Sequence, residues 1–153
     1  MSKPYPHRAS GLDWVYLANG FTRHKTPYGP GVSIARADAL HEAIAAQIVT
    51  APWRVRGQEV RFLRAMMDLS QDGLARALGT TRASVARWEA ARDQPIPGTA
   101  DRALRLLYAV KAARRGVARR VAEAPSATDR TGGHGRVVFR ATAQGWQTEA
   151  AAA

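Results

Sequence analysis

The sequence contains no cysteine, and this absence excludes disulfide bonds and every cysteine-ligated zinc site. It fits a chain kept in a reducing compartment, and we expect a cytoplasmic location. The four histidines are scattered, and none has the spacing of a metal-ligand pair. We therefore expect no metal ion and no cofactor.

Long apolar runs are also missing, because no stretch approaches the ~18 apolar residues of a membrane span. Residues 1–11 lack the apolar core of a signal peptide. We therefore expect no membrane partner. A length of 153 residues allows one domain, or one small domain with an appended module.

The residue sets that enzymes need are equally scarce. The sequence shows no nucleophile–base set, no phosphate-cradling glycine loop and no metal cluster. His41 and Glu42 fall in an amphipathic helix and are better interpreted as its solvated face. We expect that the chain is not an enzyme.

What the chain has in excess is positive charge, and the charge is concentrated in its middle. The net charge is +11, and residues 53–122 alone carry fifteen basic and six acidic residues. A localised basic surface attracts a polyanion and releases its counterions. Arginine-rich chains are common for other reasons, so the location of the charge matters more than its size.

The two ends of the chain show strand-like patterns. Residues 12–21 form a β-branched and aromatic cluster, and Asn19-Gly20 predicts a hairpin turn that leads to a returning strand over 21–26. A loop over 27–31 and a short strand over 32–34 follow. Near the other end, residues 136–148 predict a second hairpin. Since neither segment can bury its aromatic face alone, we expect both to pair in one small sheet.

The middle of the chain is helical. Helices are expected over 37–49, 57–67, 71–78, 82–91 and 99–123. Asp38 is a candidate N-cap of the first, and Leu104, Leu107, Tyr108 and Val110 form the apolar side of the last. The expected organisation is an N-terminal β-containing segment plus helix, a helical domain, a linker, a β-hairpin and a disordered tail, over 1–52, 53–123, 124–135, 136–149 and 150–153.

Residues 69–89, LSQDGLARALGTTRASVARWE, carry the most specific pattern. Ser70 and Thr81 are suited to cap two short helices, and Gly79 suits the turn between them. Gln71 would donate to a phosphate at the first helix's N-terminus. Val85 and Trp88 would pack into the core. The outward residues of the second helix are Arg82, Ala83, Ser84 and Arg87, which can meet base edges in a DNA major groove.

Two amphipathic helices from an ordinary bundle, with arginines in solvent, would fit the helical pattern alone. The complete string favours a helix-turn-helix, and residues 57–108 closely resemble the Xre/Cro-type helix-turn-helix of phage repressors. The resemblance implies a mainly α, five-helix lambda-repressor-like domain, accompanied here by the small β element. It implies that Gln71, Thr81, Arg82, Ala83, Ser84 and Arg87 lie at the DNA. It also implies a structural ion pair between Arg64 and Glu89.

The Trp-Glu pair and the continuation PIPGTADRALRLLY resemble more narrowly the MqsA/YgiT-type antitoxin regulators. Those relatives often begin with a Cys-x-x-Cys zinc module, which this chain lacks. Several use a polar base-reading side chain where this sequence has Ala83. One direct base contact is therefore expected to be missing.

The sequence thus predicts a transcriptional repressor, possibly autoregulatory, that binds double-stranded DNA as a homodimer and is nucleoid-associated when bound. The alternative is an antitoxin that also represses its operon and binds a toxin protein. A small partner that co-purifies with the chain would distinguish the two.

Overall fold

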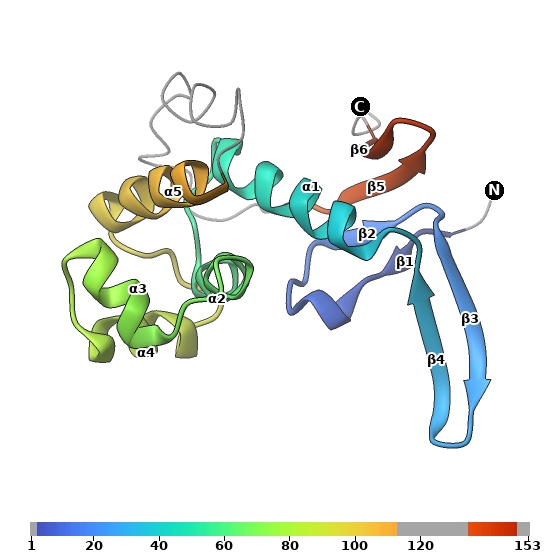
Figure 1. The fold of residues 1–153 in the computed structure, drawn as a ribbon, viewed down its shortest axis with the longest axis horizontal. Coiled ribbons are helices and arrows are strands. Elements are labelled where there is room, and N and C mark those ends of the chain that lie inside the picture. Colours follow the sequence, from blue (N-terminus) through green and yellow to red (C-terminus); the bar gives the residue numbers. More distant parts are fainter. Residues whose placement is uncertain (1–2, 113–134, 150–153) are drawn as a thin grey trace. The chain divides into compact units, whose positions relative to one another are not determined.

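The computed structural model describes residues 3–112 and 135–149. Contacts divide the chain into a sheet unit, Met1–Ile44 with Gly135–Ala153, and a helical unit, Ala45–His134. Figure 1 shows the elements of both. No helix of the described part is long and apolar enough to cross a membrane.

Five α-helices and six strands make up the described chain. The helices are α1 (Ala37–Thr50), α2 (Gly57–Met66), α3 (Gln71–Leu78), α4 (Arg82–Ala90) and α5 (Gly98–Ala112). The strands are β1 (Tyr5–Pro6), β2 (Val15–Leu17), β3 (Phe21–Thr26), β4 (Gly29–Ile34), β5 (Val137–Thr142) and β6 (Gly145–Thr148), with a 3-10 turn at Arg8–Ser10.

The sheet unit contains a four-stranded sheet in the order β1-β2-β5-β6. Strand β2 pairs in parallel with β5, so that Val15 lies opposite Val137. The expected pairing of the two ends of the chain is therefore confirmed for β2, whereas β3 and β4 form a separate two-stranded sheet. The buried aromatic side chains of this unit are Trp14, Phe139 and Trp146, which come from both ends of the sequence.

The hairpin expected at Asn19-Gly20 is wrong. Strand β3 pairs with β4 instead, and Phe21 lies opposite Ile34. The Asn19 side chain continues the pairing of β2 with β5: its Nδ2 donates to the Ala141 carbonyl at 3.2 Å, and its Oδ1 accepts from the Ala141 N–H at 2.7 Å. Gly20 has a φ of 77°, and an added Cβ would lie 2.5 Å from the Trp146 ring. Asn19-Gly20 is thus a bend between two sheets.

Both hairpins turn on the same four-residue pattern, Thr-x-x-Gly. The Thr26 hydroxyl accepts from the Tyr28 N–H at 3.2 Å and donates to the Gly29 carbonyl at 2.6 Å. Thr142 makes the equivalent bonds to Gln144 and Gly145 at 3.2 and 2.8 Å. Both glycines have positive φ, 114° and 122°. The 27–31 segment expected as a loop is therefore a two-residue turn followed by β4.

The helices lie close to their expected ranges, with three corrections. Asp38 is inside the first turn of α1, because the helix begins one residue earlier at Ala37. Val110 is 72% exposed, because Leu104 and Tyr108 direct the buried face of α5 elsewhere. Trp88 is only half-buried. The expected continuation of α5 to 123, most of the 124–135 linker and the tail lie outside the described residues.

Candidate functional site

Helix α3 begins and ends as its capping residues predict. The Ser70 hydroxyl accepts from the Gly73 N–H at 2.9 Å. Leu74 and Ala75 are buried, and the small Ala75 lets the neighbouring helix approach. Gly79 adopts φ 72°, a left-handed conformation that glycine reaches without a steric penalty. Gln71 is left at the helix N-terminus, half-exposed.

Helix α4 packs against both α2 and α3 and presents its first turn to solvent. The Thr81 hydroxyl caps it by accepting from the Ser84 N–H at 3.1 Å. Val85 is its one buried residue within the described chain. Arg82, Ala83 and Arg87 are exposed, as the sequence pattern requires of residues that meet a partner.

Ser84 is half-buried and has partners on its own helix. Its hydroxyl bonds with the Thr81 hydroxyl at 3.0 Å and accepts from Nη2 of Arg87 at 3.3 Å. These bonds hold the Arg87 guanidinium over the outer face of α4. Ser84 therefore orients a neighbouring arginine in addition to any contact of its own.

A two-pronged ion pair joins α2 to α4. Nε and Nη2 of Arg64 donate to Oε2 and Oε1 of Glu89 at 2.6 and 2.8 Å. Nη1 of Arg64 donates to the Leu69 carbonyl at 3.0 Å. The hydrogen bonds to Glu89 raise the pKa of Arg64, and the charge of Glu89 adds to the effect against the opposing effect of burial.

The same carboxylate reaches Gln71, whose Nε2 donates to Oε1 of Glu89 at 3.3 Å. Glu89 therefore fixes the end of α2 and the start of α3 together. An amide nitrogen carries two hydrogens, so this bond leaves Gln71 with a second donor for a ligand.

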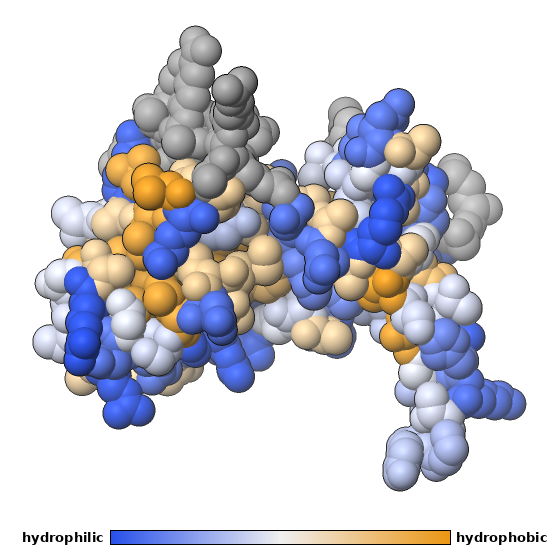
Figure 2. All heavy atoms as spheres, in the orientation of Figure 1, coloured by the Kyte–Doolittle hydropathy of each residue, from blue (hydrophilic) through white to orange (hydrophobic). Residues whose placement is uncertain are grey.

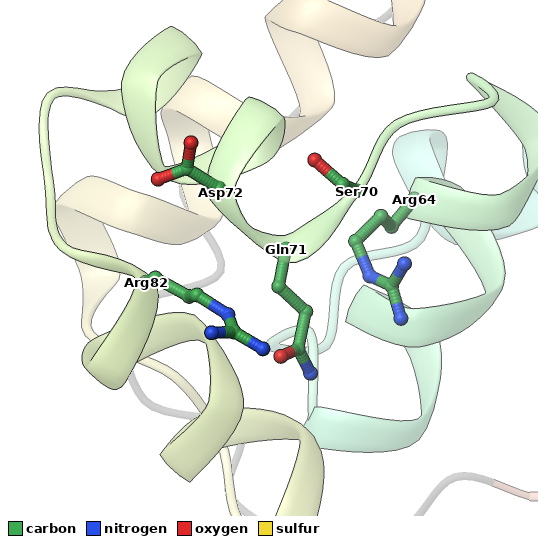
Figure 3. A pocket seen from close by; sticks show the side chains of 5 residues that line it. All are labelled: Arg64, Ser70, Gln71, Asp72 and Arg82. Atoms are coloured by element: carbon green, nitrogen blue, oxygen red, sulfur yellow. The ribbon is translucent and has the colours of Figure 1, made fainter.

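Gln71 and Arg82 extend into one pocket between α3 and α4 (Figure 3). The pocket has a volume of about 650 Å³ and is also lined by Arg64, Ser70 and Asp72. Asp72 pairs with Arg76 at 3.0 Å. With an amide donor, a guanidinium and the N-terminus of α3 at its wall, the pocket suits one anionic oxygen group.

The role of Gly57, the first residue of α2, was not predicted from the sequence. A Cβ at this position would lie 2.0 Å from the Trp88 carbonyl oxygen and 2.7 Å from that of Ala91. The Gly57 N–H also donates to the Gln94 carbonyl at 3.2 Å. The start of α2 therefore lies directly against the end of α4. The sequence shows a glycine at the start of a helix, but it does not show which residues pack against that glycine.

A buried ion pair on α5 was not predicted either. Nε of Arg105 donates to Oδ1 of Asp101 at 2.6 Å, and both side chains are buried. Nη1 of Arg105 donates to the carbonyls of Ile48 and Ala51 at 3.0 and 2.7 Å, while Oδ2 of Asp101 accepts from the Val55 N–H at 2.7 Å. The pair fixes the chain between α1 and α2. The Asp-x-x-x-Arg spacing was its only signal.

No group of three or more histidine or acidic side chains is arranged for a metal ion within residues 3–112 and 135–149. The helix-turn-helix family model matches residues 60–107, which run from α2 into α5. No curated protein and no solved structure matches the chain. The match covers about a third of the chain and indicates a helix-turn-helix domain of the Xre/Cro type, which suggests a DNA-binding transcription regulator.

Proposed function

We propose that this chain is a sequence-specific transcriptional repressor that inserts the first turn of α4 into the DNA major groove. The observation that carries the proposal is the arrangement of α4. Val85 and Glu89 fix one side of the helix, and Ala83 and Arg87 are exposed on its other side. Arg82 is exposed at the N-terminus of the helix, beside Gln71. A rigid helix with basic residues toward its N-terminus is the geometry by which helix-turn-helix proteins read base edges.

Each side chain has a role in the proposal. Gln71 and the N-terminus of α3 hold a phosphate in the pocket between α3 and α4, which fixes the register. Arg87 donates to a guanine, Arg82 to a guanine or the adjacent phosphate, and Ser84 to a base or the backbone. Ala83 offers only a methyl group, so its contact is restricted to the methyl of thymine. Thr81 is the N-cap of α4 and faces the DNA backbone.

We further propose a homodimer, because two half-sites multiply both affinity and specificity. Leu106 and Val110 lie one turn apart on α5 and are 40% and 72% exposed. This apolar pair supports α5 as part of the dimer surface. Sedimentation of the Leu106→Lys/Val110→Lys variant should show a monomer, and an unchanged mass would remove α5 from the interface.

The experiment that tests the function is selection of bound duplexes from a random DNA library. The wild-type chain should enrich one motif with two related halves, and the DNA upstream of its own coding region should contain it if the regulator is autoregulatory. A variant with Arg82→Ala and Arg87→Ala should enrich none. Recovery of unrelated duplexes by the wild-type chain would contradict sequence-specific binding.

The second candidate is an antitoxin that also represses its operon. The observation in its favour is the separate sheet unit, which provides a module besides the helix-turn-helix. The narrower resemblance to the MqsA/YgiT type rests on the sequence motifs alone. A small protein that co-purifies with the intact chain, and whose toxicity the chain relieves, would support this candidate. Neither candidate requires catalysis, a cofactor or a metal.

A further inference from the structure

The β3–β4 hairpin is long, although few contacts with the rest of its unit stabilise it. Each strand has six residues, and among the described residues the two strands pair only with each other. All residues of the two strands are exposed or half-exposed, so the hairpin has no face that the described part of the chain buries. Figure 1 shows the two strands as a ribbon that extends beyond the four-stranded sheet of the same unit. Isolated two-stranded ribbons are marginally stable, so a long ribbon of this kind suggests a role in binding a partner.

The charge of this ribbon has one sign. Residues 14–37 contain Arg23, Lys25 and Arg36 and no acidic residue. Arg23 and Lys25 are two apart on β3 and therefore lie on the same face. The guanidinium of Arg23 lies over the rings of Tyr5 and Phe21, 5.5 and 5.8 Å from their centroids, which directs it along this face. Figure 2 shows hydrophilic and intermediate residues toward the end of the hairpin.

The opposite face of the hairpin carries mostly small side chains. It carries small side chains or none at Gly29, Gly31 and Ser33, together with Thr22 and His24. At the tip, Tyr28 is fully exposed, and the hydrogen bonds of Thr26 hold its turn in shape. A narrow basic ribbon with an ordered aromatic tip fits a groove between phosphate strands, since a DNA major groove admits a two-stranded β-ribbon.

We propose that the β3–β4 hairpin is a second DNA-contacting element, separate from α4. Arg23 and Lys25 bind backbone phosphates, and Tyr28 reaches the floor or edge of a groove. Charge complementarity favours DNA over a protein partner, because the hairpin has basic side chains and no carboxylate that could pair with basic residues of a protein. Its exposed large apolar side chains are Tyr28 and Val32. The ligand is the DNA of the proposed function, but the contact belongs to the sheet unit and is tested separately.

The first test is the salt dependence of binding to a 40-base-pair mixed-sequence duplex. Each phosphate contact contributes about 0.9 to the slope of log affinity against log salt concentration. The Arg23→Gln/Lys25→Gln variant should therefore lower the slope by about two. The matched control, Lys3→Gln/Arg8→Gln, removes two exposed charges from the same unit outside the hairpin and should leave the slope unchanged. An equal slope for both double variants would overturn the proposal.

The second test uses the absence of cysteine. A single cysteine at Tyr28→Cys, labelled with a photo-crosslinker, should crosslink to the duplex in the intact chain. Gln144→Cys occupies the same turn position in the other hairpin and should not. No crosslink from position 28, or equal crosslinks from both, overturns the proposal. Crosslinking to single-stranded RNA in place of the duplex also overturns it.

These results are distinguishable from failure of the proposed function. If the hairpin variant binds less tightly while the library selection enriches no motif, the hairpin contact stands and sequence-specific reading by α4 does not. If a motif is enriched and the hairpin variant binds as the wild type does, only the hairpin contact is lost. A wild-type chain that binds no duplex overturns both.

Discussion

Arg64 and Glu89 form a bidentate ion pair that joins α2 to the end of the exposed helix α4, with donor–acceptor distances of 2.6 and 2.8 Å. Both side chains are mostly buried, 19% and 7% exposed. Glu89 also holds Gln71, because it accepts a third hydrogen bond from Nε2 of that residue. The position of α4 and the orientation of a proposed phosphate ligand therefore depend on one carboxylate.

Arg64→Ala should lower the free energy of unfolding by about 3 kcal/mol, because it leaves the Glu89 carboxylate buried without its cation. The double variant Arg64→Met/Glu89→Leu should recover part of the loss, since no charge is then left unpaired. Urea unfolding followed by circular dichroism measures both. A single variant as stable as the wild type would mean that the pair is a solvent-screened contact.

Gly57→Ala should destabilise the helical unit by about 1–3 kcal/mol through overpacking. The new methyl group meets backbone oxygens of Trp88 and Ala91, which cannot move without shifting α4. Gly98→Ala is the control, because Gly98 also begins a helix but has open space around its added Cβ. Thermal unfolding of both variants checks this. Similar melting temperatures for the two would show that α2 and α4 adjust freely.

The sheet unit should lose stability as the pH falls below 6.5, the usual pKa of histidine. Burial lowers the pKa of His7, and the charge of His41 lowers it further. The unfolded chain therefore binds a proton at a higher pH than the folded unit does. The stability that neutral His7 contributes is complete above pH 6.5 and is lost as the pH falls from 6.5 through the lowered pKa. The rings of the two histidines are stacked 6.3 Å apart, and Nε2 of His7 has no hydrogen-bond partner within the described chain.

Hydrogen-exchange protection of the Ala18 and Val137 amides, which join β2 to β5, measures this effect. Protection factors corrected for intrinsic exchange should fall between pH 7.5 and 5.5. His7→Leu should abolish the fall, whereas His24→Gln, at an exposed site, should not. A fall that persists in the His7 variant would assign the pH dependence to another group.

Arg87→Ala should weaken binding to the selected duplex by about 1–3 kcal/mol and leave binding to scrambled DNA nearly unchanged, because it removes a base contact. Gln71→Ala should weaken binding to both duplexes alike, because it removes a phosphate contact. Lys111→Ala, at the end of α5, is the control for loss of one charge. A competition gel shift gives the two affinities. Equal losses on both duplexes would make Arg87 a phosphate contact.

The sequence predicts local features of this fold well, because caps and turns depend on a few neighbouring residues. Ser70, Gly79 and Thr81 mark the ends of α3 and α4 where the structure has them. The Thr-x-x-Gly turns are equally local, yet Asn19-Gly20 is the stronger hairpin signal in general and led to the wrong strand pairing. The competing partner of Asn19 is Ala141, 122 residues away.

Features that depend on contacts between residues distant in sequence were not predicted, because local patterns do not identify the partner. An arginine on α5 looks solvated by periodicity alone, but Arg105 is buried because carbonyls at the end of α1 and an aspartate one turn earlier satisfy it. Gly57 is required only because the end of α4 lies against it. Arg64 and Glu89 were expected from the family resemblance and not from their spacing.

Methylation interference on the selected duplex distinguishes major-groove reading by α4 from other modes of binding. Methyl groups at guanine N7 lie in the major groove, where Arg82 and Arg87 are proposed to bind. We expect interference at guanines in two half-sites about one helical turn apart. The Arg82→Ala/Arg87→Ala variant should lose the guanine signal with unchanged thermal stability. Binding that guanine N7 methylation leaves intact, while minor-groove methylation of adenine blocks it, would contradict major-groove reading by α4.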